Sequence, residues 1–397
     1  MLLAGSLGLG HEMLARSCAG LLERSGWGTR TLNSMSLLGS GSGSAGEKVF
    51  SRLVRVPGLY DGLHFAHLRT GSRLAGLLDR AACARLVPAL RAELDRAPAD
   101  LVISVFATGA SAAAKLRAER PALRTVVLCT DVAVHRIWVS EGTDLFLVTS
   151  PAAAASVRRY LPRAPVAVVP PPVRPDFYAA PSREQARAAL GVPPGAFCVL
   201  VIDSGWGFGH LVQTASELAR AGVQVLAVAG RKRAVERQLR ELAAVTPQVI
   251  PFGFTDRVPE LMTAADLVVA LPGATTCSEA RVIGRPLLLL DVMPGHGRDN
   301  LLHELELGAA HVCVPTPRGV TASVLALRGA VSAPQPGYRA PPRRRWEAAF
   351  AAALRRIGVD LRPAVLSLAG LPGNGDAVAA AGRRAMPSVS GAPLETP

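Results

Sequence analysis

The sequence predicts an α/β protein made of two doubly wound parallel sheets, and three observations support this. Short apolar, β-branched runs recur in both halves of the chain, and each is followed by a stretch with helical spacing. At 397 residues the chain exceeds the usual size of one hydrophobic core. A proline-rich stretch at residues 169–184 suits a stiff connector. We therefore expect one domain at residues 1–168 and another at 185–330.

The first half opens with a short strand, a glycine turn and a helix whose apolar residues recur at helical spacing, all within residues 1–26. Residues 36–48 are rich in glycine and serine and predict a flexible loop. Three further strands are expected, the runs LVISVF from Leu101, TVVLCT from Thr125 and LFLVTS from Leu145. Alanine-rich helices between them complete the rhythm of a doubly wound sheet.

The second half begins with the strand and turn FCVLVIDSGWG at residues 197–207. Its glycines are a weak signal for a phosphate loop, because a dinucleotide site would look similar. The next strand, VQVLAVAGRKR at 223–233, lacks the acidic residue that holds an adenosine ribose, which disfavours a dehydrogenase. Residues 331–360 predict a linker and a helix that crosses back to the first domain. Residues 361–397 have too few large apolar side chains to pack, so a disordered tail is expected.

The most informative stretch joins a strand to a helix. The run LVVAL at 267–271 ends at a Pro-Gly pair, and TTCSEARVI after Ala274 has helical spacing. The unpaired N–H groups and dipole of that helix start suit a diphosphate. One turn further in, Glu279 is placed to accept hydrogen bonds from a ribose diol. A second strand, 285–292, leads into the loop PGHGRDN at the same edge of the sheet.

These residues resemble the family 28 glycosyltransferases, which include diacylglycerol gluco- and galactosyltransferases and the lipid-linked N-acetylglucosaminyltransferase of peptidoglycan synthesis. Ser278 and Glu279 match the end of the family's G-x-T-x-(S/T)-E segment, Ala274 stands at its glycine, and Gly273 matches the glycine that precedes it. Residues 294–300 match the family's P-G-(Q/H)-x-x-x-N loop, and residues 308–310 match its G-A-A. The resemblance implies the GT-B fold, in which two Rossmann-like domains face each other across a cleft. It also implies that the glutamate holds the ribose and the loop holds the sugar hydroxyls.

The first half carries separate motifs of the same family. GLGH at 8–11 resembles the family's G-x-G-H, whose histidine faces the acceptor hydroxyl, and residues 130–138 resemble the T-D-x-x-x-H-x-x-W block of the diacylglycerol enzymes. This resemblance implies that Gly10, His135 and Trp138 bind the acceptor. The connector VAVVPPPVRPDF at 166–177 also resembles its counterpart in the family.

The donor implied by the resemblance is a UDP-sugar, with the uracil near Phe254 and the phosphates near Arg231. No D-x-D sequence is present, so we expect neither a metal ion nor another cofactor. The expected donor-binding residues are Gly205, Gly207, Gly209, Arg231, Phe254, Gly273, Thr275, Thr276, Ser278, Glu279, Pro294, Gly295, His296, Asp299 and Asn300.

Two residues are candidates for the base that takes a proton from the acceptor hydroxyl. His11 is the first choice, because a neutral imidazole suits this step near pH 7. Asp131 is its competitor, or a partner that orients the acceptor. Alternatively His11 only caps its helix or bonds the sugar, and His135 with Trp138 only packs under the sheet edge. The remaining histidines show no ligand spacing and are treated as structural: His64, His67, His210, His303 and His311.

Composition bears on partners and location. The net charge is +14, carried almost entirely by arginine, a pattern that GC-rich coding explains as well as a selected basic surface does. No zinc-finger, RNP-like or helix-turn-helix pattern favours nucleic acid, so an anionic membrane is the better-suited partner. Residues 50–80 mix apolar and aromatic residues with arginines, which is typical of a membrane-facing acceptor segment or of an amphipathic helix packed on the sheet.

The location expected is the cytoplasm, with peripheral attachment to the inner face of the plasma membrane. Six scattered cysteines indicate reduced, packed thiols, and the apolar start lacks the basic region of a signal peptide. No apolar run is long enough to span a membrane.

The sequence thus predicts an inverting, metal-independent hexosyltransferase that moves a sugar from a UDP-sugar to a glycerolipid, diacylglycerol first among them. Three alternatives remain open at this point. They are transfer to a soluble aglycone, a UDP-sugar 2-epimerase of the same fold, and an inactive UDP-binding descendant.

Overall fold

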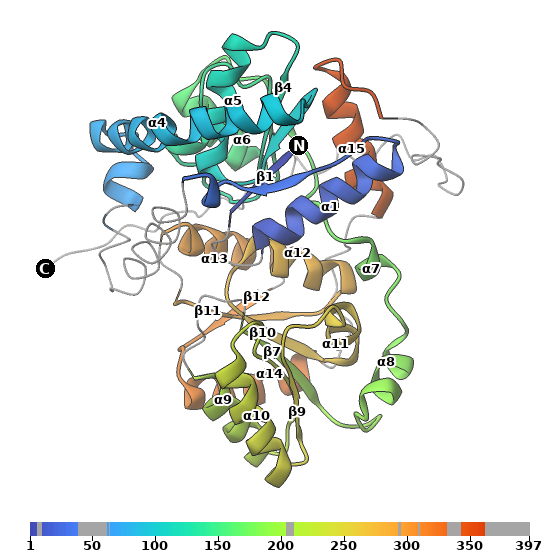
Figure 1. Cartoon of the computed structure of the whole chain (residues 1–397). Helices are drawn as coiled ribbons and strands as arrows, with labels where there is room; N and C mark the ends of the chain where they lie inside the picture. Colours follow the sequence, from blue (N-terminus) through green and yellow to red (C-terminus); the bar gives the residue numbers. More distant parts are fainter. Residues whose placement is uncertain are drawn as a thin grey trace, which may run out of the picture.

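The structure is a computed structural model that describes residues 1–5, 10–38, 62, 64–203, 210–292, 295–308, 310–331 and 343–361. These residues form two parallel sheets, each of six strands, in two separate lobes (Figure 1). Helices α1 (Gly10–Arg24), α12 (Ala274–Ile283) and α13 (His296–Glu306) lie where the lobes meet (Figure 1). The doubly wound α/β architecture predicted from the sequence is confirmed.

The first-lobe sheet has the strand order β2-β1-β3-β4-β5-β6, with all neighbours parallel. Its strands are β1 (Leu2–Ala4), β2 (Thr31–Asn33), β3 (Leu101–Ser104), β4 (Arg124–Cys129), β5 (Leu145–Val148) and β6 (Val166–Val168). The chain winds outward from β1 in one direction to β2 and then returns to its other side at β3. The carboxyl ends of β1 and β3 therefore form a topological switch point, where open α/β sheets bind ligands.

Helices cover this sheet on both faces. They are α1, α4 (Arg73–Arg96), α5 (Ala107–Glu119) and α6 (Pro151–Tyr160), with the short 3₁₀ helices η1 (Ser36–Leu38) and η3 (Arg136–Trp138) and the π-helix η2 (His64–Leu68). Ser72 caps α4 through its side chain, and one face of α4 buries Ala75, Leu86 and Leu90 in the core. Of the segment at residues 50–80, the described piece packs on the lobe as an amphipathic helix, and Leu77 on its outer face is exposed. Membrane contact of this segment stays a prediction.

The second-lobe sheet has the order β12-β11-β10-β7-β8-β9, again all parallel. Its strands are β7 (Cys198–Ile202), β8 (Gln224–Val228), β9 (Val249–Phe252), β10 (Leu267–Ala270), β11 (Leu287–Leu290) and β12 (Ala310–Cys313). The helices are α7 (Pro175–Tyr178), α8 (Arg183–Leu190), α9 (Leu211–Arg220), α10 (Arg233–Val245), α11 (Val258–Ala264), α12, α13 and α14 (Pro317–Val331). The switch point here lies between β7 and β10, so β10 delivers the start of α12 to the ligand edge.

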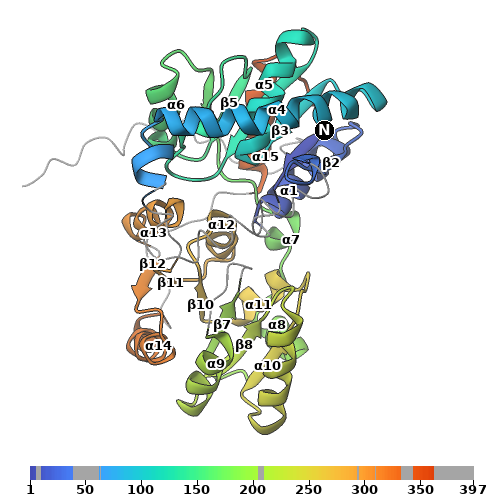
Figure 2. The same ribbon diagram turned by 60° about the vertical axis from the view of Figure 1, so that its left-hand side comes forward.

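A last helix, α15 (Arg343–Arg355), lies against the first lobe (Figure 2). Trp346 and Phe350 are completely buried there among residues of α1 and the first sheet. An ion pair of 2.8 Å between Arg24 Nη2 and Glu347 Oε1 fastens α15 to α1. Within the described ranges no helix combines the length and the apolar character needed to cross a membrane.

Candidate active site

The starts of helices α1 and α12 meet across the cleft between the lobes. Thr275 Oγ1 on α12 donates a hydrogen bond of 3.4 Å to the carbonyl of Gly10. A Cβ at position 10 would lie 3.1 Å from the same Oγ1, so glycine permits this close approach. Each helix follows a strand at its own switch point, and the two predicted sites therefore face each other.

His11 sits in the first turn of α1 in a state suited to accepting a proton. Its Nδ1 lies 2.7 Å from the carbonyl oxygen of Val105, at the end of β3, and its ring meets Phe106 edge-on at 5.0 Å. A carbonyl only accepts hydrogen bonds, so Nδ1 carries the proton in the neutral ring and Nε2 keeps its lone pair. Burial lowers the pKa of His11 below its usual value, and Asp131 only partly offsets this. The imidazole is therefore neutral near pH 7.

Asp131, after β4, lies close to His11 and is bonded across the cleft. Its Oδ1 accepts a hydrogen bond of 3.3 Å from Asn300 Nδ2 on α13, while Asn300 Oδ1 accepts one of 3.1 Å from the backbone N–H of Val132. Burial by itself would raise the pKa of Asp131, but His296, His11, Asn300 and His135 together bring it below its usual value. An ionised carboxylate here would stabilise His11 once it became an imidazolium.

Three further histidines gather around this centre. The His64 ring lies 5.9 Å from that of His135 and 6.3 Å from that of His296, and His135 lies 6.2 Å from the ring of Trp138. Burial and the neighbouring His64 lower the pKa of His135 to about 3, so this ring is uncharged. His64, which was expected to be structural, is fully buried, and its ring lies near the expected acceptor residue His135 and the expected donor residue His296.

The ribose candidate Glu279 is buried and paired. Arg174, from the connector before α7, donates through Nε and Nη2 to Glu279 Oε1 at 3.2 and 3.1 Å. Both bonds reach the same oxygen, so Oε2 is the oxygen left for a ligand. Burial raises the pKa of Glu279 to about 7, and Arg174 opposes this rise without cancelling it. Glu279 therefore changes charge close to neutral pH.

The start of α12 is open to an anion. Gly273 is its N-cap and supplies no side-chain bond to the first N–H groups, and Thr275 and Thr276 in the first turn are only half-buried. Those N–H groups and the helix dipole suit phosphate oxygens. Ser278, another expected donor residue, donates from its Oγ to the Ala274 carbonyl at 2.7 Å and so bonds its own helix. Its role in donor binding stays a prediction.

Two more expected donor residues, Arg231 and Phe254, lie against each other and next to Glu12 in the first turn of α1. The guanidinium of Arg231 stands 4.8 Å from the ring centre of Phe254, and its Nη2 lies 3.1 Å from Glu12 Oε2 on α1. Neighbouring Lys232 instead forms an ion pair of 2.7 Å with the buried Asp203. Arg231 is thus held by a carboxylate of the opposite lobe.

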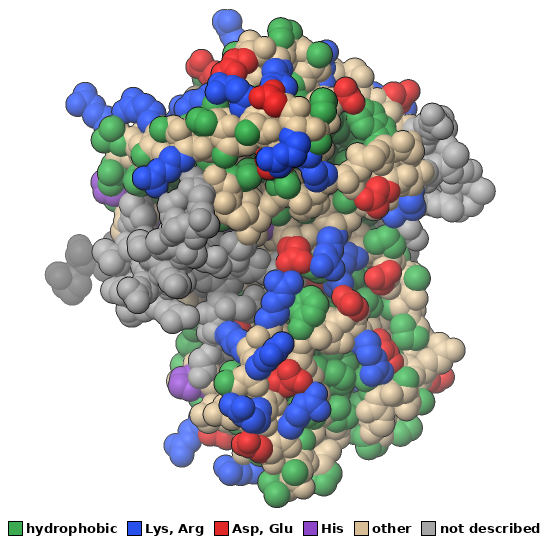
Figure 3. All heavy atoms as spheres, viewed as in Figure 1, with side chains coloured by type: hydrophobic (Ala, Val, Ile, Leu, Met, Phe, Trp, Pro, Cys, Tyr) green, Lys and Arg blue, Asp and Glu red, His purple; other side chains and the backbone are tan. Residues whose placement is uncertain are grey.

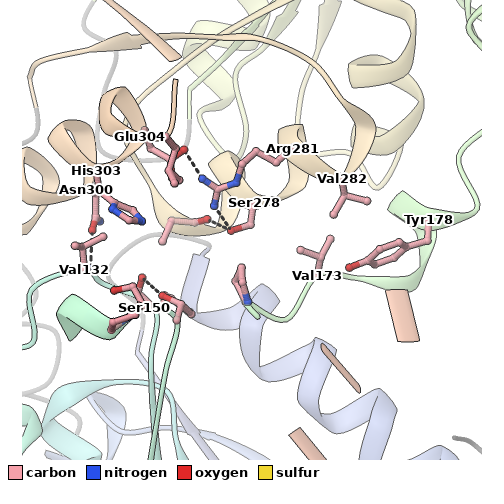
Figure 4. Close-up of a pocket in the computed structure, with 16 residues that line it drawn as sticks. Val132, Ser150, Val173, Tyr178, Ser278, Arg281, Val282, Asn300, His303 and Glu304 are labelled. Atoms are coloured by element: carbon pink, nitrogen blue, oxygen red, sulfur yellow. Dashed lines mark hydrogen bonds and ion pairs between the residues drawn. The ribbon is translucent and has the colours of Figure 1, made fainter. Parts of the chain in front are cut away.

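A cavity of about 270 Å³ opens beside Asn300, between the lobes (Figure 4). Helices α12 and α13 form one wall through a buried ion pair of Arg281 with Glu304, while Val132 and Ser150 of the first lobe lie opposite (Figure 4). The remaining wall is largely apolar and includes Pro171, Val173, Tyr178, Val282 and Leu307. The cavity therefore suits a ligand with a few hydroxyl groups and an apolar part.

The structure brings most of the predicted site residues to one cleft, but not all can be placed. Gly205, Gly207, Gly209 and Pro294 lie outside the described residues. Sequence reasoning missed four residues that lie within ion-pair distance of predicted ones: Glu12, His64, Arg69 and Arg174. Arg174 had a sequence signal because it stands in the recognised connector, and His64 and Arg69 stand in the segment at residues 50–80 that the sequence marked as a candidate acceptor region.

Two family models match the chain. Residues 208–318 match the glycosyltransferase family 28 C-terminal domain, and residues 54–173 match monogalactosyldiacylglycerol (MGDG) synthase. These matches confirm the family resemblance in both halves.

Curated relatives agree with these models. A processive diacylglycerol beta-glucosyltransferase of Bacillus pumilus is 28% identical over 196 residues, which cover 47% of this chain and 50% of that protein. A probable monogalactosyldiacylglycerol synthase 2 of Oryza sativa subsp. indica is 26% identical over 207 residues, 49% of this chain and 44% of the relative. The chain thus spans about half the length of the curated relatives it matches.

Solved structures support the fold alone. Os79 from O. sativa superposes with a TM-score of 0.54 at 15% identity, covering 90% of this chain and 94% of that one. A UDP-glucosyltransferase from Polygonum tinctorium gives a TM-score of 0.52 at 14% identity, covering 93% and 95%. The two facing sheets are those of a GT-B protein.

Proposed function

We infer that this chain, which carries a family 28 glycosyltransferase C-terminal domain beside a segment of the MGDG synthase family, transfers a hexose from a UDP-sugar to diacylglycerol. The observation that carries this proposal is the pairing of a neutral, half-buried His11 with the open start of α12 across one cleft. The first lobe supplies a base for the acceptor hydroxyl, and the second lobe supplies a binding site for a diphosphate.

The donor would bind mainly to the second lobe. Its phosphates would meet the N–H groups of the first turn of α12 and the guanidinium of Arg231, and its ribose diol would bond Glu279 Oε2. Fixed dipoles and arginine would then balance the charge that develops on UDP, so no metal ion is required. Metal independence stays a prediction.

The chemical step follows from these positions. His11 Nε2 takes the proton of the acceptor hydroxyl while that oxygen bonds to the anomeric carbon. The bond from the anomeric carbon to the phosphate oxygen breaks on the opposite face, and UDP leaves with the electron pair. A single displacement of this kind inverts the anomeric configuration. Asp131 stabilises the imidazolium that His11 becomes.

The cavity beside Asn300 is our candidate for the acceptor glycerol. Its hydroxyl-bearing wall at Thr130 and Ser150 suits the glycerol oxygens, and its apolar wall suits the first acyl carbons. Asn300 bonds Asp131, so the cavity opens next to the proposed catalytic base His11 and its partner Asp131.

Helix α4 offers a surface for peripheral attachment to a membrane. Leu74, Leu77 and Leu78 are 40%, 54% and 44% exposed, and the same face presents the exposed Arg73 and Arg80. Figure 3 shows apolar and basic side chains side by side over this lobe. An apolar face edged by arginines suits the boundary of an anionic bilayer.

The decisive experiment supplies diacylglycerol in anionic liposomes with UDP-glucose, UDP-galactose or UDP-N-acetylglucosamine in separate reactions. Glycolipid is measured by mass spectrometry and UDP release in parallel, for wild type and His11→Ala. A glycolipid that disappears in the variant supports the proposal. UDP binding without glycolipid would contradict it, and an epimerised UDP-sugar formed without acceptor would establish an epimerase instead.

The membrane surface has its own test. Leu77→Asp should reduce cosedimentation with anionic liposomes several-fold, because it places a charge in the apolar face. Leu325→Asp, on α14 of the second lobe and 42% exposed, is the matched control. Equal loss in both variants would reject α4 as the contact.

A further inference from the structure

The π-helix η2 is firmly attached to the first lobe. The Tyr160 hydroxyl donates a hydrogen bond to the Arg69 carbonyl, and Arg69 N–H donates to the His64 carbonyl at 2.8 Å, which closes the π turn. Gly71 follows with φ +71°, a conformation that favours glycine, and lies against Tyr160. Short π segments are rare and often occur at functional sites.

From this anchored segment two side chains cross to the second lobe and meet one carboxylate. Arg69 Nη1 donates to Asp299 Oδ1 at 2.7 Å, and His64 Nε2 lies 3.6 Å from Asp299 Oδ2. His64 is fully buried, and the Asp299 side chain is only 12% exposed. We call this set, His64, Arg69 and Asp299, the interlobe latch.

The latch holds the turn of α13 that faces the loop after β4, which carries Asp131 and Val132 and is called the acceptor loop below. Asn300, the next residue after Asp299, bonds both Asp131 and the Val132 N–H. His296, one turn earlier on the same helix, lies beside the His64 ring. One helical turn is therefore held at both Asp299 and Asn300 by separate elements of the first lobe.

We propose that His64 and Arg69 are positioning residues for glycosyl transfer, and that Asp299 serves the latch instead of binding the donor sugar. Through Asp299 they set the turn of α13 so that Asn300 holds Asp131 beside His11. This inference rests on the proposed function for its kinetic consequence, but the latch itself is a contact between lobes that is measurable without catalysis.

The latch predicts a specific defect. The ribose and phosphate residues on α12 do not touch it, so UDP affinity should survive its loss. The base and the acceptor loop depend on the α13 turn, and a small misplacement there slows a reaction strongly. A donor that is bound but poorly aligned with the acceptor should lose more of its sugar to water.

The test compares Arg69→Met with Arg91→Met. Arg69 and Arg91 are equally exposed, at 40% and 41%, and each pairs with a carboxylate at 2.7 Å, but the Arg91 pair with Glu119 stays inside the first lobe. Three quantities are measured for each variant: the rate of glycolipid formation, the ratio of sugar hydrolysis to transfer, and the Kd of UDP. Small-angle X-ray scattering gives the separation of the lobes.

Arg69→Met is expected to slow transfer about tenfold or more, raise the hydrolysis ratio and leave the Kd of UDP within about twofold. Arg91→Met should match wild type, and Arg69→Lys should restore part of the transfer rate because it keeps the charge. Asp299→Asn should reproduce the defect and add little to Arg69→Met in the double variant.

Two results would overturn the proposal. In the first, Arg69→Met and Arg91→Met behave alike. In the second, transfer and UDP binding fall together, as a merely destabilised fold would cause. Should the wild-type protein form no glycolipid, the proposed function fails, and the scattering curves then decide the latch. An Arg69→Met protein no more extended than Arg91→Met would reject it.

Discussion

The two sides of the cleft handle charge in opposite ways. On the first lobe, burial keeps His11 and His135 neutral beside an ionised Asp131. On the second lobe, the charged groups are already paired, Glu279 with Arg174 and Arg231 with Glu12. The first side is ready to receive a proton, whereas the second side must exchange or share its partners when an anionic donor arrives. Substitutions should therefore affect rate on one side and affinity on the other.

The largest expected effect is on rate. His11→Ala should lower kcat by about 10²–10⁴-fold, the usual contribution of a positioned base, while the Kd of UDP stays unchanged. The control is His311→Ala, which removes an exposed imidazole from β12. A glycolipid rate in His11→Ala close to that of wild type would move the base to Asp131.

Replacing Asp131 should change the pH dependence of kcat. A histidine base acts in its unprotonated, neutral form, and burial lowers the pKa of His11. The loss of kcat at acid pH should therefore have its midpoint below the usual histidine pKa of about 6.5. Asp131 raises that pKa, so Asp131→Asn should move the midpoint to still lower pH and reduce kcat about tenfold. A midpoint that stays in place would separate Asp131 from His11.

The affinity side should respond to pH in its own way. Glu279 has a pKa of about 7, and only its ionised form accepts both ribose hydrogen bonds. Donor affinity should therefore rise roughly tenfold between pH 6 and pH 8, as calorimetry with UDP can measure. Glu279→Gln should bind UDP more weakly and show no such rise. A pH dependence that persists in this variant would come from another group.

Filling the cavity should affect only the acceptor. Val282→Phe places a ring in the apolar wall on α12, away from Glu279, and should raise the KM for diacylglycerol several-fold. The KM for the UDP-sugar should not change. A variant with an altered donor KM and a normal lipid KM would place the acceptor elsewhere.

The smallest effect is expected where the sides touch at the surface. Glu12→Gln releases Arg231 from its carboxylate, and should tighten UDP binding by a few-fold at most, since exposed ion pairs contribute about 0–1 kcal/mol. Arg16→Gln, which removes the other partner of Glu12, is the control. Weaker UDP binding in Glu12→Gln would mean that Glu12 orients Arg231 for the donor.

The fold was predictable because its strands are local signals. Runs such as residues 198–202 and 267–270 are buried on both faces and therefore continuously apolar. The short strand β2 escaped prediction because it lies at the sheet edge and is partly exposed, so nothing in Thr31–Asn33 demands burial. Glu279 was found from its place one turn into a helix start and again through the resemblance, whereas His11 was found through the resemblance.

The partners of those residues were not predictable in the same way. Arg69 and Asp299 are 230 positions apart, and neither has a spacing that points to the other. His64 looked like any isolated histidine until the π turn placed it between His135 and His296. Contacts between lobes depend on how two separately folded sheets meet, which no local pattern of residues records.

The return of α15 to the first lobe also bears on the order in which the chain folds. Trp346 and Phe350 belong to the core that contains Leu14 and Leu21, so during synthesis that core stays incomplete until the whole second lobe has been made. The second lobe, built from one continuous stretch, can close first. Phe350→Ala, which should cost about 3–5 kcal/mol, would then slow the last step of folding while leaving the earlier unit intact. A nascent chain halted before α15 would expose the apolar side of α1 and need protection from aggregation.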